Sequence, residues 1–214
     1  MCGRITLTMP DVDAVAAALE ASVSPEDAAL YRPRWNGAPT DRLWILLPDR
    51  RLVPALWGFP GGLINARAET AAGLPAFRDA FAHRRVVVPA DGFYEWKGAK
   101  SDRRPVWFRP RAGGLLHLAG LAGTAPDGRP CFVVLTIEAA GPVADLHDRM
   151  PVLLPRDRCQ AWLERADSSL LVPAPPDFLT ATEVSTRVNS VANDDAECVA
   201  PPAPPAPRRQ LSLF

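Results

Sequence analysis

The sequence predicts an α+β fold in which a mostly antiparallel sheet closes toward a barrel and short helices lie around it. Short apolar runs of strand length recur throughout the 214 residues, and turn residues separate them. The strand–helix–strand alternation that builds a parallel sheet does not appear. Charged residues make up 22% and hydrophobic residues 48%, which is typical of a globular protein with a substantial core.

The first sixty residues carry clear local signals. Thr8 is a candidate helix cap, Pro10 suits the first helical turn, and apolar residues then recur at helical spacing as far as Leu19. Residues 32–40 have the composition of irregular chain. The strands expected in this part are 5–7, 43–47 and 52–57, of which the last two form a hairpin.

Two segments in the middle of the chain combine strand signals with polar side chains. After a flexible corner at 57–62, Asn65 and Arg67 alternate with apolar neighbours, as on a strand with one functional face. Residues 86–96 predict a strand, a glycine break and a second strand that carries Glu95 among aromatic residues. A carboxylate in such surroundings has a raised pKa and can exchange a proton near neutrality. Alternation also allows a solvent-facing Glu95.

The second half of the chain continues as strands separated by turns. His147 precedes an apolar strand and lies two residues before Arg149, although a histidine alone is more often a hydrogen-bonded structural residue. The further strands expected are 106–108, 115–121 and 131–137, and residues 178–191 add a last strand and a turn. The expected helices are 75–84 and 155–164, and the domain spans residues 1–195.

Composition narrows the classes of function. Lys+Arg and Asp+Glu both total 24, which argues against a protein that coats duplex nucleic acid by charge alone, so DNA would contact a local patch. The four cysteines form no CxxC pair, so neither a zinc site nor a disulfide framework is expected, and no metal or cofactor is predicted. Without a signal peptide or membrane span, we expect a cytoplasmic monomer.

Cys2 has the most distinctive chemistry in the sequence. Once Met1 is removed, Cys2 carries an α-amine with an ordinary pKa of roughly 7.7 to 8.0 beside a thiol with an ordinary pKa of about 8.5, which needs only modest help to ionise. Such a pair can condense with an aldehyde to a Schiff base and then close a five-membered thiazolidine ring. The alternative is a small buried residue in a first strand, which is how buried cysteines usually behave.

Several sequence blocks occur together in a fixed order. The main blocks are Cys2-Gly3-Arg4, residues 63–70, residues 90–96 and residues 147–151, with weaker ones at 36–39 and 184–194. Together they resemble the SRAP family, the SOS response-associated peptidases or abasic-site-processing proteins. The resemblance covers residues 2 to about 195.

This resemblance implies that Cys2 captures the ring-opened aldehyde of an abasic site in single-stranded DNA as a covalent thiazolidine, protecting the site during replication and repair. It also implies a cysteine peptidase that removes its own Met1, with DNA–protein crosslinking and lyase-like activity. The implied catalytic positions are Cys2, Asn65, Glu95 and His147, and the implied DNA-binding positions are Arg4, Asn36, Arg67, Thr136 and Arg149.

The chemistry of the implied catalytic residues suggests their roles. Glu95 would shuttle protons, His147 would donate to the sugar oxygen, and Asn65 would orient the α-amine. One segment departs from the family pattern, in which a longer stretch with further aromatic residues commonly follows position 58. Here only residues 59–62 stand before Leu63, and because stacking contributes about 1 to 3 kcal/mol per base, we expect weaker or differently shaped DNA binding.

The C-terminal segment changes in character. Residues 196–209 form a proline-rich linker whose positions 201–209, at about 3.1 Å per residue, could span roughly 28 Å. The last five residues are similar to the pentapeptide by which bacterial replication and repair proteins bind the DNA polymerase sliding clamp, although an accidental apolar terminus is the alternative. The expected clamp-binding residues are Gln210, Leu211, Leu213 and Phe214.

Two other functions remain open from the sequence. An N-terminal-nucleophile amidohydrolase also exposes a cysteine at residue 2, but it would hydrolyse an amide and ignore aldehydes. A non-catalytic single-strand-binding module tethered to the clamp would bind undamaged and abasic DNA alike and would tolerate Cys2→Ser.

Overall fold

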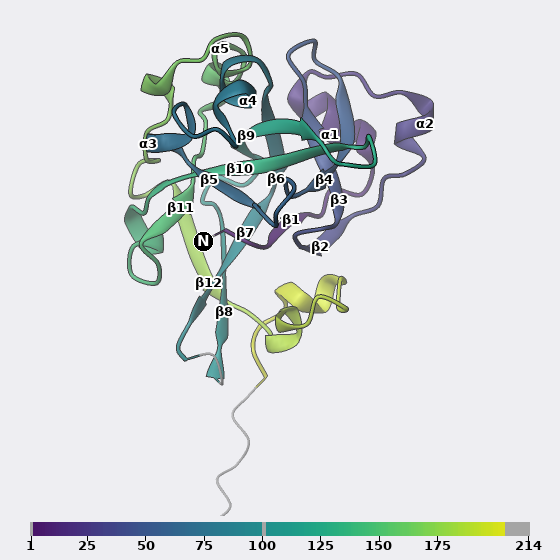
Figure 1. The fold of residues 1–214 in the computed structure, drawn as a ribbon. Helices are drawn as coiled ribbons and strands as arrows, with labels where there is room; N and C mark the ends of the chain where they lie inside the picture. Colours follow the sequence, from purple (N-terminus) through teal and green to yellow (C-terminus); the bar gives the residue numbers. More distant parts are fainter. Residues whose placement is uncertain (1, 100–101, 204–214) are drawn as a thin grey trace, which may run out of the picture.

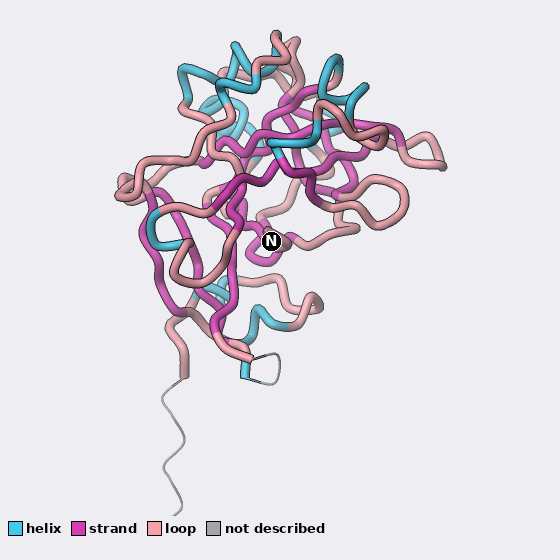
Figure 2. Tube along the Cα trace, turned by 60° about the vertical axis from the view of Figure 1, so that its left-hand side comes forward, coloured by secondary structure: helices cyan, strands magenta, loops and turns pink. Residues whose placement is uncertain are grey.

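A computed structural model describes residues 2–99 and 102–203 of the chain (Figure 1). Strands dominate, and the helices lie around them (Figure 2). The strands are β1 (Ile5–Leu7), β2 (Arg34–Gly37), β3 (Arg42–Leu46), β4 (Leu52–Trp57), β5 (Asn65–Arg67), β6 (Arg85–Ala90), β7 (Gly92–Lys97), β8 (Arg104–Pro110), β9 (Leu116–Thr124), β10 (Pro130–Glu138), β11 (Arg149–Pro151) and β12 (Leu179–Glu183). The α-helices are α1 (Val12–Leu19), α2 (Pro25–Ala28), α3 (Ala68–Ala71), α4 (Arg78–His83) and α5 (Cys159–Glu164).

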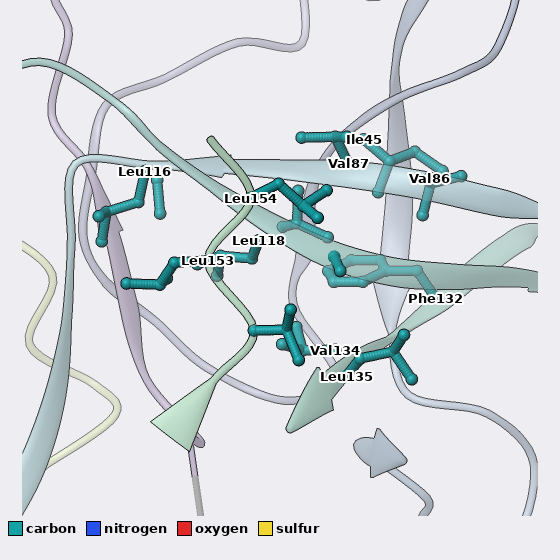
Figure 3. Packing of buried hydrophobic residues seen from close by; sticks show 14 of the residues in the cluster. Ile45, Val86, Val87, Leu116, Leu118, Phe132, Val134, Leu135, Leu153 and Leu154 are labelled. Carbon is teal, nitrogen blue, oxygen red and sulfur yellow. The ribbon is translucent and has the colours of Figure 1, made fainter. Parts of the chain in front are cut away.

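Five strands close into a barrel, which confirms the predicted fold class. Their order is β10-β4-β3-β6-β9, and β9 pairs again with β10 to complete the ring. Within this ring only β4 and β10 run parallel. The predicted hairpin is confirmed, because β3 pairs antiparallel with β4 over its whole length. Figure 3 shows buried side chains from these strands, among them Val86, Leu118 and Phe132, packed against one another.

A second sheet, in the order β12-β8-β7-β1-β2, carries the N-terminal segment. β1 lies between β7 and β2 and pairs antiparallel with both. Asp91 fixes β1 from the side, because its carboxylate accepts the Thr6 hydroxyl at 2.5 Å and the Thr8 backbone N–H at 2.6 Å. Asp91 therefore anchors β1, and Cys2 and Gly3 lie just before this anchored strand.

The first helix begins later than we expect from the sequence. Thr8 is bonded to Asp91, and the cap of α1 is Asp11, whose side chain accepts the backbone N–H of Ala14 at 2.7 Å. The helical apolar spacing is confirmed, since Val12, Val15, Ala16 and Leu19 are buried. The predicted helix 155–164 is also present, with its first turn as a 3₁₀ helix, Arg156–Arg158, ahead of α5.

Three other segments differ from expectation. The stretch 32–40, expected to be irregular, contains β2. The strand expected over 63–70 ends at Arg67, where the chain turns into α3. The corner after β4 is a closed turn, because Phe59 N–H donates to the Leu63 carbonyl at 2.8 Å and Gly61 and Gly62 have φ of 84° and 76°. The ring of Phe59 packs on Phe77 in this turn.

The C-terminal segment covers the outer face of the second sheet. After β12 it forms two 3₁₀ turns, Thr186–Asn189 and Ala196–Val199, and buries Val188 and Cys198 against Tyr94. The packed structure therefore runs beyond residue 195, the boundary expected from the sequence. The predicted linker 196–209 lies partly, and the predicted clamp-binding residues Gln210, Leu211, Leu213 and Phe214 lie wholly, outside the described residues.

Within residues 2–99 and 102–203, none of the helices has the length and apolar content needed to span a membrane.

Candidate active site

The antiparallel pairing of β1 with β7 brings Cys2 and Glu95 together. Ile5 pairs with Phe93, and the backbone N–H of Tyr94 donates to the Arg4 carbonyl at 3.0 Å, so Glu95 lies opposite Gly3. The side chains of Cys2 and Glu95 are both buried, with 0% and 3% of their surfaces exposed. The alternative of a solvent-facing Glu95 is therefore wrong.

Asn65 links the barrel to the start of β1. β5, which carries it, pairs parallel with β10 at the barrel edge, and Asn65 Nδ2 donates to the carbonyl oxygen of Cys2 at 2.7 Å. The contact is with the carbonyl of Cys2, whereas we expect the α-amine from the sequence. Asn65 Oδ1 is buried and has no hydrogen-bond partner among the described residues. One acceptor beside Cys2 is thus available.

The environment of these groups favours their neutral forms. Burial, together with the negative charge of Glu95, raises the pKa of the Cys2 thiol above its ordinary value. Burial also raises the pKa of Glu95, and the charge of His147 opposes that shift. Burial therefore opposes ionisation of the thiol, and a reaction through the thiolate needs a proton acceptor close by.

His147 stands on the opposite side of the site, just before β11. Its Nδ1 accepts the backbone N–H of Arg149 at 2.9 Å, which leaves the proton of the neutral ring on Nε2. The Asp148 carboxylate lies 2.8 Å from the same Nδ1, and only a protonated Nδ1 can donate to it. The two contacts are alternatives, and the neutral ring presents an Nε2–H donor.

A cleft of about 670 Å³ opens beside Glu95 and His147, while Cys2 and Asn65 are the sequence neighbours of its lining residues Gly3 and Ile64. Its walls come from the start of β1, the end of β7 and the C-terminal segment. The residues that line it are Gly3, Arg4, Ala38, Pro39, Ile64, Glu95, Trp96, Gly98, Arg103, His147, Asn189 and Val191. The cleft thus joins two of the expected catalytic residues, Glu95 and His147, to the expected phosphate contact Arg4.

Arg4 carries a positive charge that neutral groups hold in place. Its Nη1 donates to Asn36 Oδ1 at 2.7 Å and to the Val188 carbonyl at 2.8 Å, and its guanidinium lies over the ring of Trp96, 5.6 Å from the centroid. Since none of these partners is a carboxylate, the charge remains available to an anion in the cleft.

Two residues expected to contact DNA are instead internal. Asn36 is 0% exposed, and its Nδ2 donates to the carbonyls of Val188, Ser190 and Asn193 at 3.2, 3.0 and 2.7 Å. Thr136 is 1% exposed, and its hydroxyl donates to the Ala66 carbonyl at 3.4 Å. Both side chains lack the exposure that a DNA contact needs, so they support the site from behind.

Arg149 and Arg67 lie at the same end of the fold, beyond His147. Arg149 donates through Nη1 and Nη2 to the two carboxylate oxygens of Glu69, at 2.7 and 2.8 Å, and through Nη2 to the Thr136 carbonyl at 2.6 Å. Arg67 is exposed at the end of β5. The guanidinium of either residue can bind a phosphate, but that of Arg149 is already paired with the Glu69 carboxylate.

Sequence reasoning assigned no role to several residues that line the cleft, among them Trp96, Arg103, Asn189 and Val191. Trp96 Nε1 donates to Asn189 Oδ1 at 2.7 Å, which fixes the ring beside Arg4. Val191 is 62% exposed although it is apolar. Its exposure has no local sequence signal, because it results from the way the C-terminal segment folds back over the second sheet.

A second cavity of about 650 Å³ lies between α1, the β3–β4 turn and α5, away from Cys2. Among the described residues that line it, both arginines have acceptors. Arg50 donates to the backbone carbonyls of Leu19 and Glu20, and Arg156 pairs with the Glu20 carboxylate at 2.8 Å. Burial, with Arg156, lowers the pKa of His117. In residues 2–99 and 102–203, no group of three His, Cys, Asp or Glu side chains is placed to hold a metal ion.

Both the sequence and the fold of this chain are similar to those of known proteins. Residues 1–191 match the family described as SOS response associated peptidase (SRAP). The chain is 34% identical to the abasic site processing protein YoaM of Bacillus subtilis, over 92% of this chain and 96% of the relative. It is 30% identical to the abasic site processing protein YedK of Escherichia coli, over 94% and 100%. A crystal structure of a protein from Bacteroides thetaiotaomicron has the same fold, with a TM-score of 0.81, 18% identity and coverage of 94% and 99%.

Proposed function

Because this chain belongs to the SOS response-associated peptidase (SRAP) family, we propose that it processes abasic sites by capturing their ring-opened aldehyde covalently on Cys2. Relatives that are named for abasic site processing support the substrate. The observation that carries the proposal is the hydrogen bond from Asn65 Nδ2 to the Cys2 carbonyl, because it holds Cys2 beside the buried Glu95 and next to the cleft.

The reaction requires two bonds to form at one carbon. After Met1 is removed, the α-amine of Cys2 adds to the aldehyde carbon C1′ and water leaves, which gives an imine. The thiol sulfur then adds to the same carbon while its proton moves to the nitrogen. The product is a thiazolidine, and the net change is the loss of one water molecule.

The surrounding groups suit these steps. Glu95, whose pKa burial raises, accepts the proton of the thiol or α-amine and returns one to the departing water. The Nε2–H of His147 donates to the sugar oxygen as the ring opens. Asn65 Oδ1, buried and without a partner among the described residues, accepts an N–H of the freed α-amine. Arg4, Arg67 and Arg149 bind backbone phosphates.

Two further activities follow from the same site. With water as the second reactant, Glu95 and the Cys2 thiol would allow the chain to hydrolyse its own Met1–Cys2 peptide bond, which releases methionine and frees the α-amine of Cys2, in keeping with the peptidase label of the family. At the imine stage, removal of a C2′ proton would expel the 3′ phosphate, which is the lyase-like side reaction. Thiazolidine closure competes with this elimination by consuming the imine.

Intact mass spectrometry tests the proposal directly. The purified protein is measured alone and after mixing with a single-stranded oligonucleotide that carries one abasic site. We expect the loss of Met1 and a mass gain equal to the oligonucleotide minus one water. Cys2→Ala should abolish the adduct, and Cys159→Ala, which removes a buried thiol distant from the cleft, should not. No adduct from protein that lacks Met1 would refute the proposal and turn attention to amide substrates.

We also propose that the C-terminal pentapeptide binds the DNA polymerase sliding clamp and carries the protein to replication sites. Its support is the sequence of Gln210–Phe214 and the proline-rich tether that begins at the exposed residues 201–203. A chain that ends at residue 209 should lose its affinity for the clamp in surface plasmon resonance and keep its crosslinking of abasic DNA. Equal clamp affinity of the truncated and full chains would disprove the tether.

A further inference from the structure

The guanidinium of Arg149 is held by a carboxylate in the geometry that a phosphate takes. Glu69 accepts from Nη1 and Nη2 at 2.7 and 2.8 Å, one oxygen for each nitrogen. Two parallel N–H···O bonds of this kind are the way in which arginine binds a phosphodiester. Glu69 therefore occupies the edge of Arg149 that a DNA phosphate would need.

The other edge of Arg149 is not open to DNA. Nη2 also donates to the Thr136 carbonyl at 2.6 Å, Nε is a buried atom, and the side chain as a whole is only 14% exposed. Glu69, by contrast, is 47% exposed at the first turn of α3. A phosphate that reaches Arg149 must approach from the side of Glu69 and displace its carboxylate.

A second arginine, Arg67, lies near the Glu69 carboxylate and can pair with it when a phosphate displaces it from Arg149. Glu69 lies two residues after the exposed Arg67, and the charges of Arg149 and Arg67 both act on its carboxylate. A phosphate offers Arg149 the same two acceptor oxygens that Glu69 does, so the exchange leaves the number of hydrogen bonds to its guanidinium unchanged. The exchange leaves the two arginines shared between one carboxylate and the DNA backbone.

We infer that Glu69 is an internal competitor for the DNA phosphate at Arg149, and that it sets how tightly the cleft binds single-stranded DNA before the covalent step. The inference rests on the proposed function, because it assumes that DNA phosphates reach this end of the cleft. Glu69 weakens binding to undamaged strands, so residence on DNA depends more strongly on capture of an aldehyde by Cys2.

The test measures reversible binding, which needs no covalent chemistry. Fluorescence anisotropy follows an undamaged single-stranded oligonucleotide titrated with the wild type and with Glu69→Gln at several salt concentrations. Glu69→Gln should bind roughly fivefold more tightly, because a neutral amide competes less well than a carboxylate for the guanidinium of Arg149. The slope of log K against log salt should steepen by about 0.7, because one more phosphate releases its counterion.

A matched control separates this effect from a general change in charge. Asp127→Asn removes a carboxylate from an ion pair with Arg129, at 2.6 Å in the β9–β10 turn, and changes the net charge by the same amount. Arg129 lines a separate hollow with Arg42 and Pro54, away from the cleft. Asp127→Asn should bind DNA as the wild type does.

A double variant isolates the coupling to Arg149. In an Arg149→Gln background, Glu69→Gln should no longer change the affinity. Unchanged or weaker binding by Glu69→Gln, or a gain that persists without Arg149, would overturn the inference. If the wild type fails to crosslink abasic DNA, the proposed function is lost, whereas crosslinking by the wild type with no gain in Glu69→Gln removes only the competitor.

Discussion

The buried amide of Asn36 connects three parts of the chain that are distant in sequence. It accepts from Arg4 at the start of β1, and it donates to backbone carbonyls at Val188, Ser190 and Asn193 in the C-terminal segment. Asn36→Ala removes all of these bonds at once. The variant should be markedly less stable, and the arginine that faces the cleft should lose its orientation.

The size of the effect follows from the bonds that are lost. Nδ2 has two hydrogens for three carbonyls, so it contributes two full hydrogen bonds, each of about 1 kcal/mol. The bond from the charged Arg4 contributes about 2 kcal/mol. The free energy of unfolding should therefore fall by about 4 kcal/mol, and the melting temperature of a chain of this length by about 10 °C.

Urea unfolding, followed by tryptophan fluorescence, measures this loss. Asn189→Ala is the control, because that amide also makes two hydrogen bonds, with Trp96 and the Arg103 carbonyl, but at an exposed position. The control should lose less than about 1 kcal/mol, since water replaces exposed partners. An Asn36→Ala variant that loses no more than the control would refute the reasoning.

Three other variants test the fold and the site. Burial raises the pKa of Glu95 above its ordinary 4.5, so the folded state is destabilised as pH rises from about 4.5 through the folded pKa. The wild type should therefore lose stability relative to Glu95→Gln over that pH range. Profiles of unfolding free energy against pH that run parallel for the two proteins would contradict this. Arg85 is 5% exposed and donates to carbonyls at the ends of α4 and α5, so Arg85→Met should lower the free energy of unfolding in urea by about 3 kcal/mol. A loss below about 1 kcal/mol would show that the carbonyls at these helix ends find other donors. A Cβ at Gly92 would lie 2.1 Å from Trp107 Nε1, beside β1, so Gly92→Ala should lower the free energy of unfolding by about 1 to 3 kcal/mol and slow crosslinking. A variant that is fully active and equally stable would show that β1 can shift freely.

The sequence predicts well those features whose causes are local. The β3–β4 hairpin has two apolar runs and a turn between them, and its strands form nearly as expected. The alternation of Asn65, Ala66 and Arg67 correctly separates the buried apolar Ala66 from two polar residues that are less buried. The barrel class follows from the recurrence of such short strands.

Features that depend on distant partners could not be predicted in this way. Position in a family pattern suggests that Asn36 and Thr136 contact DNA, yet carbonyls about 150 residues later enclose Asn36, and the barrel wall encloses Thr136. The pair of Glu69 with Arg149 joins residues 80 positions apart. The cap of α1 lies at Asp11 for a similar reason, because Asp91, between β6 and β7, engages Thr8.

The closure of the site by the C-terminal segment has a consequence for synthesis on the ribosome. Cys2 is among the first residues to emerge from the ribosome. The partners that hold Arg4, Asn36 and Arg34, which are the carbonyls of residues 188–193 and the carboxylate of Asp194, emerge nearly two hundred residues later. A nascent chain therefore lacks the partners that orient Arg4 until translation is almost complete, and a prematurely terminated chain that ends before Val188 should carry Cys2 without an ordered Arg4.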